Sequence, residues 1–403
     1  MALPSYHNYT FNLTPINQHP TDIDSHHLQT QPTPTINNNL HTTTPDHSND
    51  PFHSPIDYPS DSSSDDDSFL CNKEERQRNL PFGDLITNNK EHDHSRIIFQ
   101  NVNSLELSSG QHTLELVCDS ISQFEIDIAC LAETNTNWKN PSSKTSFQET
   151  KQRHWQHSHS ITSETDIEWS DIYKPGGTAI ITLPPFSPSI TTSGSDPIGL
   201  GRWSYITISG RDNIKLTIIS AYRVYQKSIK HAGPSTNIRQ QCQCLEEQNL
   251  EDTNIRDLMI NDLAEFITIL LNKEHEIIVG IDENEANDQP KNGVDKLLQL
   301  TKLINVISQQ HGIRKEPNTH IRGRKRIEFL LCSKHIYTFI DISGIKPFND
   351  ITSSDHRDFF LDLRLKAFLK NSYIALPDHS SRPLQSSNTK CAQLQTPSKT
   401  FCS

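Results

Sequence analysis

The sequence predicts a mixed α/β domain over residues 95–368, with a polar segment on each side of it. Two observations lead to this prediction. Short apolar segments alternate with amphipathic ones through the middle of the 403-residue chain, which is the pattern of a layered α/β fold. Both ends are instead polar, and the hydrophobic fraction of the whole chain is 33%, which is low for a chain that folds throughout.

The two end segments, 1–94 and 369–403, are expected to be disordered. Their Ser, Thr, Asn, Gln and Pro residues bury too little apolar surface to offset the entropy lost on ordering. Residues 1–94 hold 14 acidic and 4 basic side chains, a balance of −10, which leaves −2 of the net charge of −12 for the rest. The predicted domain is therefore nearly neutral, and its charge does not exclude a nucleic-acid partner.

The cellular location is inferred from missing signals. Residues 1–10 lack a basic stretch followed by an apolar one, and no apolar run is long enough to cross a membrane. Eight cysteines are scattered along the chain, and the close neighbours Cys242 and Cys244 match no zinc-site spacing. We expect reduced thiols in an intracellular protein of the nucleus or cytoplasm, without membrane association. The sequence leaves the oligomeric state open.

Eight short apolar segments are expected to be strands. In chain order they are residues 97–101, 126–131, 176–182, 203–209, 216–221, 276–281, 327–332 and 359–363. The third, fourth and fifth of these are expected to lie side by side as antiparallel strands.

Three segments with apolar residues at helical spacing are expected to be amphipathic helices. They are residues 113–124, 254–271 and 294–303. The second is the clearest, since Leu258, Leu263, Phe266 and Leu270 fall on one stripe.

Polar side chains follow three of the predicted strands, and a further group lies just before a fourth strand. They are Asn101 and Asn103, Glu133, Asp282 and Asn284, and Ser354–His356. Because strand ends of a layered α/β domain converge on one edge, these groups are expected to lie close together. Each motif alone is common in turns and helix caps, so only the combination carries weight.

The combination contains what phosphodiester hydrolysis requires. Carboxylate and amide oxygens can hold Mg²⁺ or Mn²⁺, with Glu133 as the natural ligand. Asp282 can accept a proton from a water molecule that Asn284 orients, and His356, paired with a carboxylate, can donate to the reacting phosphoryl group.

The order of the motifs resembles the endonuclease/exonuclease/phosphatase superfamily, which includes DNase I, apurinic/apyrimidinic endonucleases and the endonuclease domains of non-LTR retrotransposons. The resemblance covers residues 96–363. The motifs that match, in chain order, are Gln100–Leu105, Leu131–Glu133, Gly176–Ala179, Ala221–Arg223, Gly280–Asn284, Arg326–Glu328 and Ser354–His356.

This resemblance implies a four-layered α/β sandwich of the DNase I type, with two mixed sheets face to face and helices outside. It also implies a role for each site residue. Asn101 would orient the catalytic Asp282, Asn284 would help with the water, Tyr222 would contact the phosphate, and Asp355 and His356 would complete the site. Glu133 would bind the metal, with Asn103 at a second position on the metal side.

Two residues depart from the pattern of the superfamily. Glu328 stands where an Asp usually holds the imidazole of His356, and the extra methylene shifts that carboxylate by roughly an ångström unless the backbone adjusts. Glu283 adds a charge beside Asp282. Both changes leave room for a weakened enzyme.

A basic run precedes Glu328 and indicates a nucleic-acid substrate. Four cations, Arg322, Arg324, Lys325 and Arg326, fall within five positions, and Arg357 follows His356. We therefore expect a Mg²⁺-dependent endonuclease that acts on double-stranded DNA, resembling retrotransposon-type enzymes that nick a target. Two alternatives are a nucleic-acid-binding remnant with weakened catalysis and a phosphatase or phosphodiesterase that acts on a lipid or small phosphoester.

Overall fold

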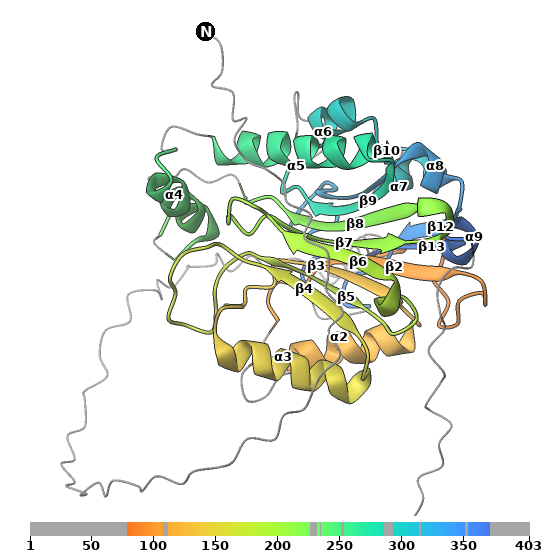
Figure 1. Ribbon diagram of the computed structural model, residues 1–403, viewed down its shortest axis with the longest axis horizontal. Coiled ribbons are helices and arrows are strands. Elements are labelled where there is room, and N and C mark those ends of the chain that lie inside the picture. The colour runs from red at the N-terminus through yellow and green to blue at the C-terminus, as the bar shows by residue number, and fades with distance from the viewer. Residues whose placement is uncertain are drawn as a thin grey trace, which may run out of the picture.

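A computed structural model describes residues 79–105, 107, 112–225, 232–233, 235–250, 254–285, 293–313, 316–350 and 354–370. Its strands form two sheets that pack face to face, with helices on the outer face of each (Figure 1). One apolar core fills the space between the sheets, and a separate core lies under the helices on each side. The predicted four-layered α/β sandwich is confirmed.

The seven-stranded sheet has the order β1-β12-β13-β2-β3-β5-β4. These strands are β1 (Phe82–Gly83), β12 (Ile340–Ile345), β13 (Phe359–Leu363), β2 (Ser95–Asn101), β3 (Ile128–Ala132), β5 (Thr178–Thr182) and β4 (His159–Ser163). The six-stranded sheet has the order β10-β11-β9-β8-β7-β6. Its strands are β10 (Ile304–Asn305), β11 (Glu328–Cys332), β9 (His275–Asp282), β8 (Lys215–Tyr222), β7 (Trp203–Ser209) and β6 (Ile190–Ser195).

Each sheet contains one parallel pair among its described strands, β2 with β3 and β8 with β9. A parallel pair needs a long crossover, and a helix supplies part of each one. These helices are α2 (His112–Gln123) and α5 (Ile255–Asn272). Because paired parallel strands end at the same edge, the last residues of β2 and β3 lie side by side, and so do those of β8 and β9.

The other described helices surround the sheets. They are α3 (Pro141–His154), α4 (Asn237–Glu247), α6 (Gly293–Thr301), α7 (Val306–His311), α8 (Lys334–Tyr337) and α9 (Leu365–Phe368), with the 3₁₀ turns η1 (Ser187–Ser189) and η2 (Arg211–Asn213). Helices α2 and α3 cover the seven-stranded sheet, whereas α5 and α6 cover the six-stranded one (Figure 1). None of the helices in the described ranges has the length and apolar character needed to cross a bilayer.

Helix α5 confirms the clearest helical prediction. The side chain of Asn254 caps its N-terminus. Asn254 Oδ1 accepts hydrogen bonds from the backbone nitrogens of Arg256 at 3.0 Å and Asp257 at 3.3 Å. Leu263 and Ile267 on its apolar stripe are fully buried against β8 and β9. The outer face of the six-stranded sheet therefore packs against this helix.

One predicted strand grouping is wrong. The segments that form β7 and β8 are antiparallel neighbours, as expected, but β5 lies in the other sheet, between β3 and β4. Its side chains alternate between two apolar cores, with Ile180 facing the opposite sheet and Ile181 facing the outer helices. A strand buried on both faces gives no sequence signal for its sheet.

The domain also extends past its predicted boundaries of 95 and 368. Strand β1 pairs with β12, and the side chain of Asn79 accepts a hydrogen bond from the backbone of Phe348 at 2.7 Å. At the other end Leu369 is buried, and its carbonyl accepts from the backbone of Arg211 at 3.3 Å. The expected disorder of residues 1–78 and 371–403 concerns segments outside the described residues.

Candidate active site

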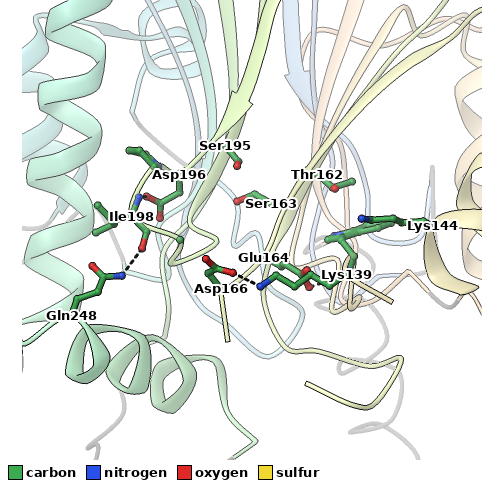
Figure 2. Close-up of a pocket in the computed structure, with 13 residues that line it drawn as sticks. Lys139, Lys144, Thr162, Ser163, Glu164, Asp166, Ser195, Asp196, Ile198 and Gln248 are labelled. Carbon is green, nitrogen blue, oxygen red and sulfur yellow. Dashed lines mark hydrogen bonds and ion pairs between the residues drawn. The ribbon is translucent and has the colours of Figure 1, made fainter. Parts of the chain in front are cut away.

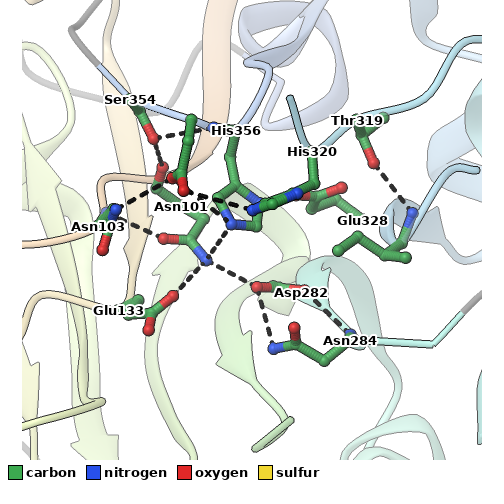
Figure 3. Close-up of polar contacts among 12 residues, drawn as sticks. Asn101, Asn103, Glu133, Asp282, Asn284, Thr319, His320, Glu328, Ser354 and His356 are labelled. Atoms are coloured by element: carbon green, nitrogen blue, oxygen red, sulfur yellow. Dashed lines mark hydrogen bonds and ion pairs between the residues drawn. The ribbon is translucent and has the colours of Figure 1, made fainter. Parts of the chain in front are cut away.

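The strand register brings the predicted polar residues to one edge of the sandwich. Asn101 ends β2 beside Ala132, which ends β3 directly before Glu133. In the facing sheet Tyr222, Asp282 and Glu328 form a row across the ends of β8, β9 and β11. The two rows face each other across the interface of the sheets (Figure 3).

The side chain of Asn101 joins the two sheets. Its Nδ2 donates hydrogen bonds to Glu133 Oε2 at 2.8 Å and to Asp282 Oδ2 at 2.7 Å, and it lies 3.4 Å from His356 Nε2. Asn101 is completely buried, so both of these donor bonds are made away from bulk water. The amide thus links two carboxylates that belong to different sheets.

Asp282 is a completely buried carboxylate of the site. Asn284 donates to it from its backbone nitrogen at 3.0 Å and from Nδ2 at 3.3 Å. Burial raises the pKa of Asp282 well above 3.8, and the neighbouring charge of Glu328 adds to this effect. A carboxylate with a raised pKa is a better proton acceptor than one in water.

Glu133 and Asn284, like Asn103 with a φ angle of +45°, adopt a left-handed backbone conformation. The φ angle is +52° at both Glu133 and Asn284, a region that residues other than glycine rarely occupy. At Glu133 this turn follows directly on β3, and at Asn284 it follows on β9. Such conformations concentrate where a structure must aim a side chain, as these turns do.

His356 is held from two sides. Its Nδ1 pairs with Glu328 Oε1, and its backbone nitrogen donates to Ser354 Oγ at 3.1 Å, which in turn donates to the carbonyl of Asn101 at 2.7 Å. Burial lowers the pKa of His356, but the charge of Glu328 and its hydrogen bond outweigh burial and raise it to about 10. The imidazole is therefore protonated at neutral pH, and its Nε2 faces Asn101.

The two departures from the superfamily pattern are accommodated. Glu328 reaches His356 despite its extra methylene, as the pairing above shows. Glu283 is fully buried, and its carboxylate pairs with the guanidinium of Arg223. Burial raises the pKa of Glu283 to about 8, against the opposing effects of Arg223 and Arg256. The added carboxyl group is thus buried against a guanidinium.

Glu133, Asp282 and His356 form a group that can hold a metal ion. One ligand atom from each lies within 4.8 Å of the other two. Burial raises the pKa of Glu133, and the carboxylates of Glu133 and Asp282 repel each other. The carboxylate oxygens of Glu133 and Asp282 are the type of ligand that a hard divalent ion prefers.

Asn103 and Tyr222 lie on either side of Glu133. The Tyr222 hydroxyl donates to Glu133 Oε1 at 3.3 Å, and burial raises the pKa of the phenol, which therefore keeps its proton. Asn103 donates from Nδ2 to Asp355 Oδ1 at 3.1 Å. Both side chains line the same cleft as Glu133, so all nine predicted catalytic and metal residues lie at this edge.

A cleft of about 690 Å³ opens above these residues. Three of the predicted cations, Arg322, Arg324 and Lys325, line this cleft together with Asn103 and Glu133. Together with His356 they give the cleft a cationic side suited to a phosphate chain.

The other two predicted phosphate contacts, Arg326 and Arg357, are wrong. Arg326 is buried, pairs with Glu316 at 3.0 Å and lies over the ring of Phe329. Arg357 has no exposed surface, donates to the carbonyl of Leu80 at 3.0 Å and lies over Phe348. Both guanidiniums are bonded inside the fold, which a count of charges along the sequence does not detect.

His320 is a residue of the site that the prediction missed. It forms a β-bridge with His356, and the two rings meet edge to face at 4.9 Å between centroids. Its Nε2 lies 3.3 Å from Asp355 Oδ2. The sequence shows His320 only as the start of a basic run, 36 positions before His356 by their numbers, so nothing local indicates the contact.

A second cavity, of about 620 Å³, lies along the same edge beside β4 and β6 (Figure 2). Its lining mixes both charges. Lys139 pairs with Asp166, and Asp196 pairs with the buried Arg202. Asp166 pairs with Lys139 here, and this cavity lacks the run of three cations that lines the active-site cleft.

Sequence comparisons find no relatives, whereas structural comparison finds the fold. No protein-family model matches the sequence. No curated protein matches it either. The structure is similar to the AP endonuclease LMAP from Leishmania major, with a TM-score of 0.52 and 13% sequence identity over 72% of this chain and 95% of that one.

Two further structures are similar at lower scores. The catalytic domain of Xenopus laevis APE2 gives a TM-score of 0.46 at 13% identity over 67% of this chain and 91% of that one. The endonuclease domain of TRAS1, a telomere-specific non-LTR retrotransposon, gives 0.42 at 14% identity over 68% and 99%. The fold assignment therefore depends on the first structure: this chain has a DNase I-like fold, as its motif order implied.

Proposed function

We propose that this protein is a divalent-metal-dependent phosphodiesterase that cuts DNA as an endonuclease. The observation that carries the proposal is the linked group of Asn101, Glu133, Asp282 and His356 at the base of a cleft with a cationic wall. This group places metal ligands, a base and a cationic donor around the Asn101 amide, with ligand atoms within 4.8 Å of one another, which is what hydrolysis of a phosphodiester needs.

Glu133, with Asn103 and Asp282 close by, would hold Mg²⁺ or Mn²⁺. Such an ion, when bound, would withdraw charge from a phosphoryl oxygen and favour attack on phosphorus. Asp282 takes the proton of the attacking water, and Asn284 holds Asp282 in place for this transfer. His356 donates from Nε2 to an oxygen of the phosphoryl group, while Glu328 keeps the imidazole charged and oriented.

The cations of the cleft favour a polymeric nucleic acid over a small phosphoester. Arg322, Arg324 and Lys325 can each meet a backbone phosphate next to the one that is cut. We propose double-stranded DNA as the substrate and a nick with a 3′-hydroxyl as the product, as the motif resemblance to retrotransposon-type endonucleases implies.

The proposal is tested by nicking of supercoiled plasmid. The wild-type chain should nick the plasmid with Mg²⁺ and not with EDTA, and Glu133→Gln should slow nicking by about 100-fold or more, because a neutral amide is a poor metal ligand. Glu265→Gln, at an exposed position of α5, is the matched control and should leave the rate unchanged. Equal rates for the Glu133 and Glu265 variants, or cleavage of phosphoinositide vesicles without cleavage of DNA, would contradict the proposal.

Glu328→Asp tests whether the longer carboxylate serves this site. The shorter side chain would lose its contact with His356 Nδ1, so nicking is expected to slow by about 10-fold or more. Single-turnover nicking rates on intact double-stranded DNA measure the effect. A faster variant would show instead that Glu328 weakens the enzyme, as a remnant of a once-active protein would.

Comparison of Arg324→Ala with Arg357→Ala distinguishes a role in DNA binding from a role in folding. Loss of one phosphate contact at Arg324 should reduce the slope of log Kd against log salt concentration by about 0.9. Arg357→Ala should leave that slope unchanged but lower the free energy of unfolding by about 2 kcal/mol or more, because it empties a buried site. Salt titrations of DNA binding and urea unfolding check both results, and an exchange of the two phenotypes would refute the assignment.

A further inference from the structure

Next to the proposed metal group lies a second one, which contains two imidazoles. One ligand atom each from His320, Asp355 and His356 lies within 4.8 Å of the others. His320 Nε2 is 3.3 Å from Asp355 Oδ2, and His356 Nε2 is 3.8 Å from Asp355 Oδ1. Ligand atoms around a tetrahedral zinc ion are roughly 3.4 Å apart, given bonds of about 2.1 Å, so small side-chain movements would complete this geometry.

We infer that His320, Asp355 and His356 form a second metal site, which takes a nitrogen-preferring divalent cation such as Zn²⁺ and blocks the active site when it is filled. The donor set decides the type of metal. Mg²⁺ prefers six oxygen ligands, whereas two imidazoles and one carboxylate suit Zn²⁺. The inference rests on the proposed function for its inhibitory effect but not for metal binding itself.

The surroundings of His356 support a ligand role. Its Nδ1 pairs with Glu328, which leaves Nε2 directed at Asn101 (Figure 3). The same nitrogen lies 3.8 Å from Asp355 Oδ1. Histidines that bind metals usually have a carboxylate at the second ring nitrogen, which orients the ring and strengthens the ligand. The pairing that holds His356 for catalysis therefore also prepares it for a metal.

Access and the fourth ligand are provided by the cleft. His320, Asp355 and His356 all line it, so an ion can enter from solvent and keep a water molecule in its fourth position. His320 must change its tautomer, because its Nδ1 accepts a hydrogen bond from the backbone of Arg322 at 3.2 Å. Binding would thus exchange one long hydrogen bond for a metal bond at Nε2.

Occupation of this site would stop the proposed reaction. A metal at His356 Nε2 displaces the proton from that nitrogen to solvent and removes the donor for the phosphoryl group. Mg²⁺ prefers oxygen ligands and would not compete with Zn²⁺ for the two imidazoles. Zn²⁺ should therefore inhibit even when Mg²⁺ is in excess.

Binding is tested with Co²⁺ as a visible probe on the full-length protein. The wild type should show a tetrahedral Co²⁺ absorption band that is lost in His320→Gln, in which the amide can keep contacts to Asp355 and to the backbone of Arg322 but binds the metal poorly. His94→Gln is the matched control, because His94 belongs to a separate candidate group with Glu91 and Asp93, and it should keep the band. Asp355→Asn provides a second loss variant. A band that survives in both His320→Gln and Asp355→Asn would overturn the inference.

Inhibition is tested by the plasmid assay at fixed Mg²⁺ with increasing Zn²⁺. The ratio of rates with and without Zn²⁺ is compared within each protein, and the concentration for half inhibition should rise by about 10-fold or more in His320→Gln. Equal inhibition of the wild type and His320→Gln would overturn the inference. A wild type that does not nick DNA at all contradicts the proposed function, and in that case the Co²⁺ comparison still decides the metal site.

Discussion

His356→Asn is expected to slow Mg²⁺-dependent nicking of DNA by about 10²- to 10⁴-fold. The imidazolium is the buried cationic donor of the site, with Nδ1 on Glu328 and Nε2 beside Asn101. Asparagine carries no charge and reaches less far, so stabilisation of the charge that builds on phosphorus is lost. The affinity for DNA should change little, because the cleft cations remain. Single-turnover rates and DNA-binding titrations measure the two effects separately.

A loss of folding must be distinguished from this loss of chemistry. His356→Asn leaves Glu328 buried without its partner, which costs stability. The double variant His356→Asn with Glu328→Gln removes that charge and should unfold closer to the wild-type midpoint while staying equally slow. His335→Asn, at an exposed position of α8 with a 63% exposed side chain, should behave as the wild type. A His356 variant within threefold of the wild-type rate would be incompatible with the proposed mechanism.

Asp282→Asn should slow the reaction by about 10³-fold or more, because it removes the base while keeping the size of the side chain. Its effect on stability should have the opposite sign. Asp282 is completely buried between Glu133 and Glu328, so neutralising it relieves repulsion as well as the cost of burying a charge. Thermal unfolding in EDTA should give a midpoint equal to or above that of the wild type.

The control for this pair of measurements is Asp119→Asn, an exposed position on α2, which should change neither the rate nor the midpoint. A slow Asp282 variant that is also less stable would point to a structural role for this carboxylate. An unchanged rate would exclude Asp282 as the base.

Much of the site could be predicted from sequence because its residues stand at the ends of apolar strands. Asn101, Tyr222 and Asp282 each end a strand that was recognisable from its apolar run, and strand ends share an edge in a layered fold. Helix α5 was equally clear from its spacing. The motif order added what periodicity lacks, the arrangement of these strands into two facing sheets.

The elements that sequence did not reveal have weak patterns or depend on distant contacts. Helix α3 offers Phe147 as its one large apolar side chain, and its structure depends on the Asn140 cap and Pro141 at its start. Strand β4 has an alternation too short to distinguish from a loop. Membership of β5 in one sheet or the other is decided by packing on both of its faces.

Charges were the least predictable part of the site. Arg324 and Arg326 are two positions apart in one basic run, yet the first lines the cleft and the second is buried against Glu316. The contact of His320 with His356 joins two loops that no local pattern connects. Whether a charged side chain meets solvent or a buried partner depends on tertiary pairing, which composition does not specify.

The central claim is that residues from two sheets act as one active site, and the double variant Asp282→Asn with His356→Asn tests it most directly. If the two groups work on the same phosphoryl transfer, the single-turnover nicking rate of the double variant should fall about as far as that of the slower single variant. Losses that multiply would mean that the two residues act independently, and that result would contradict the account.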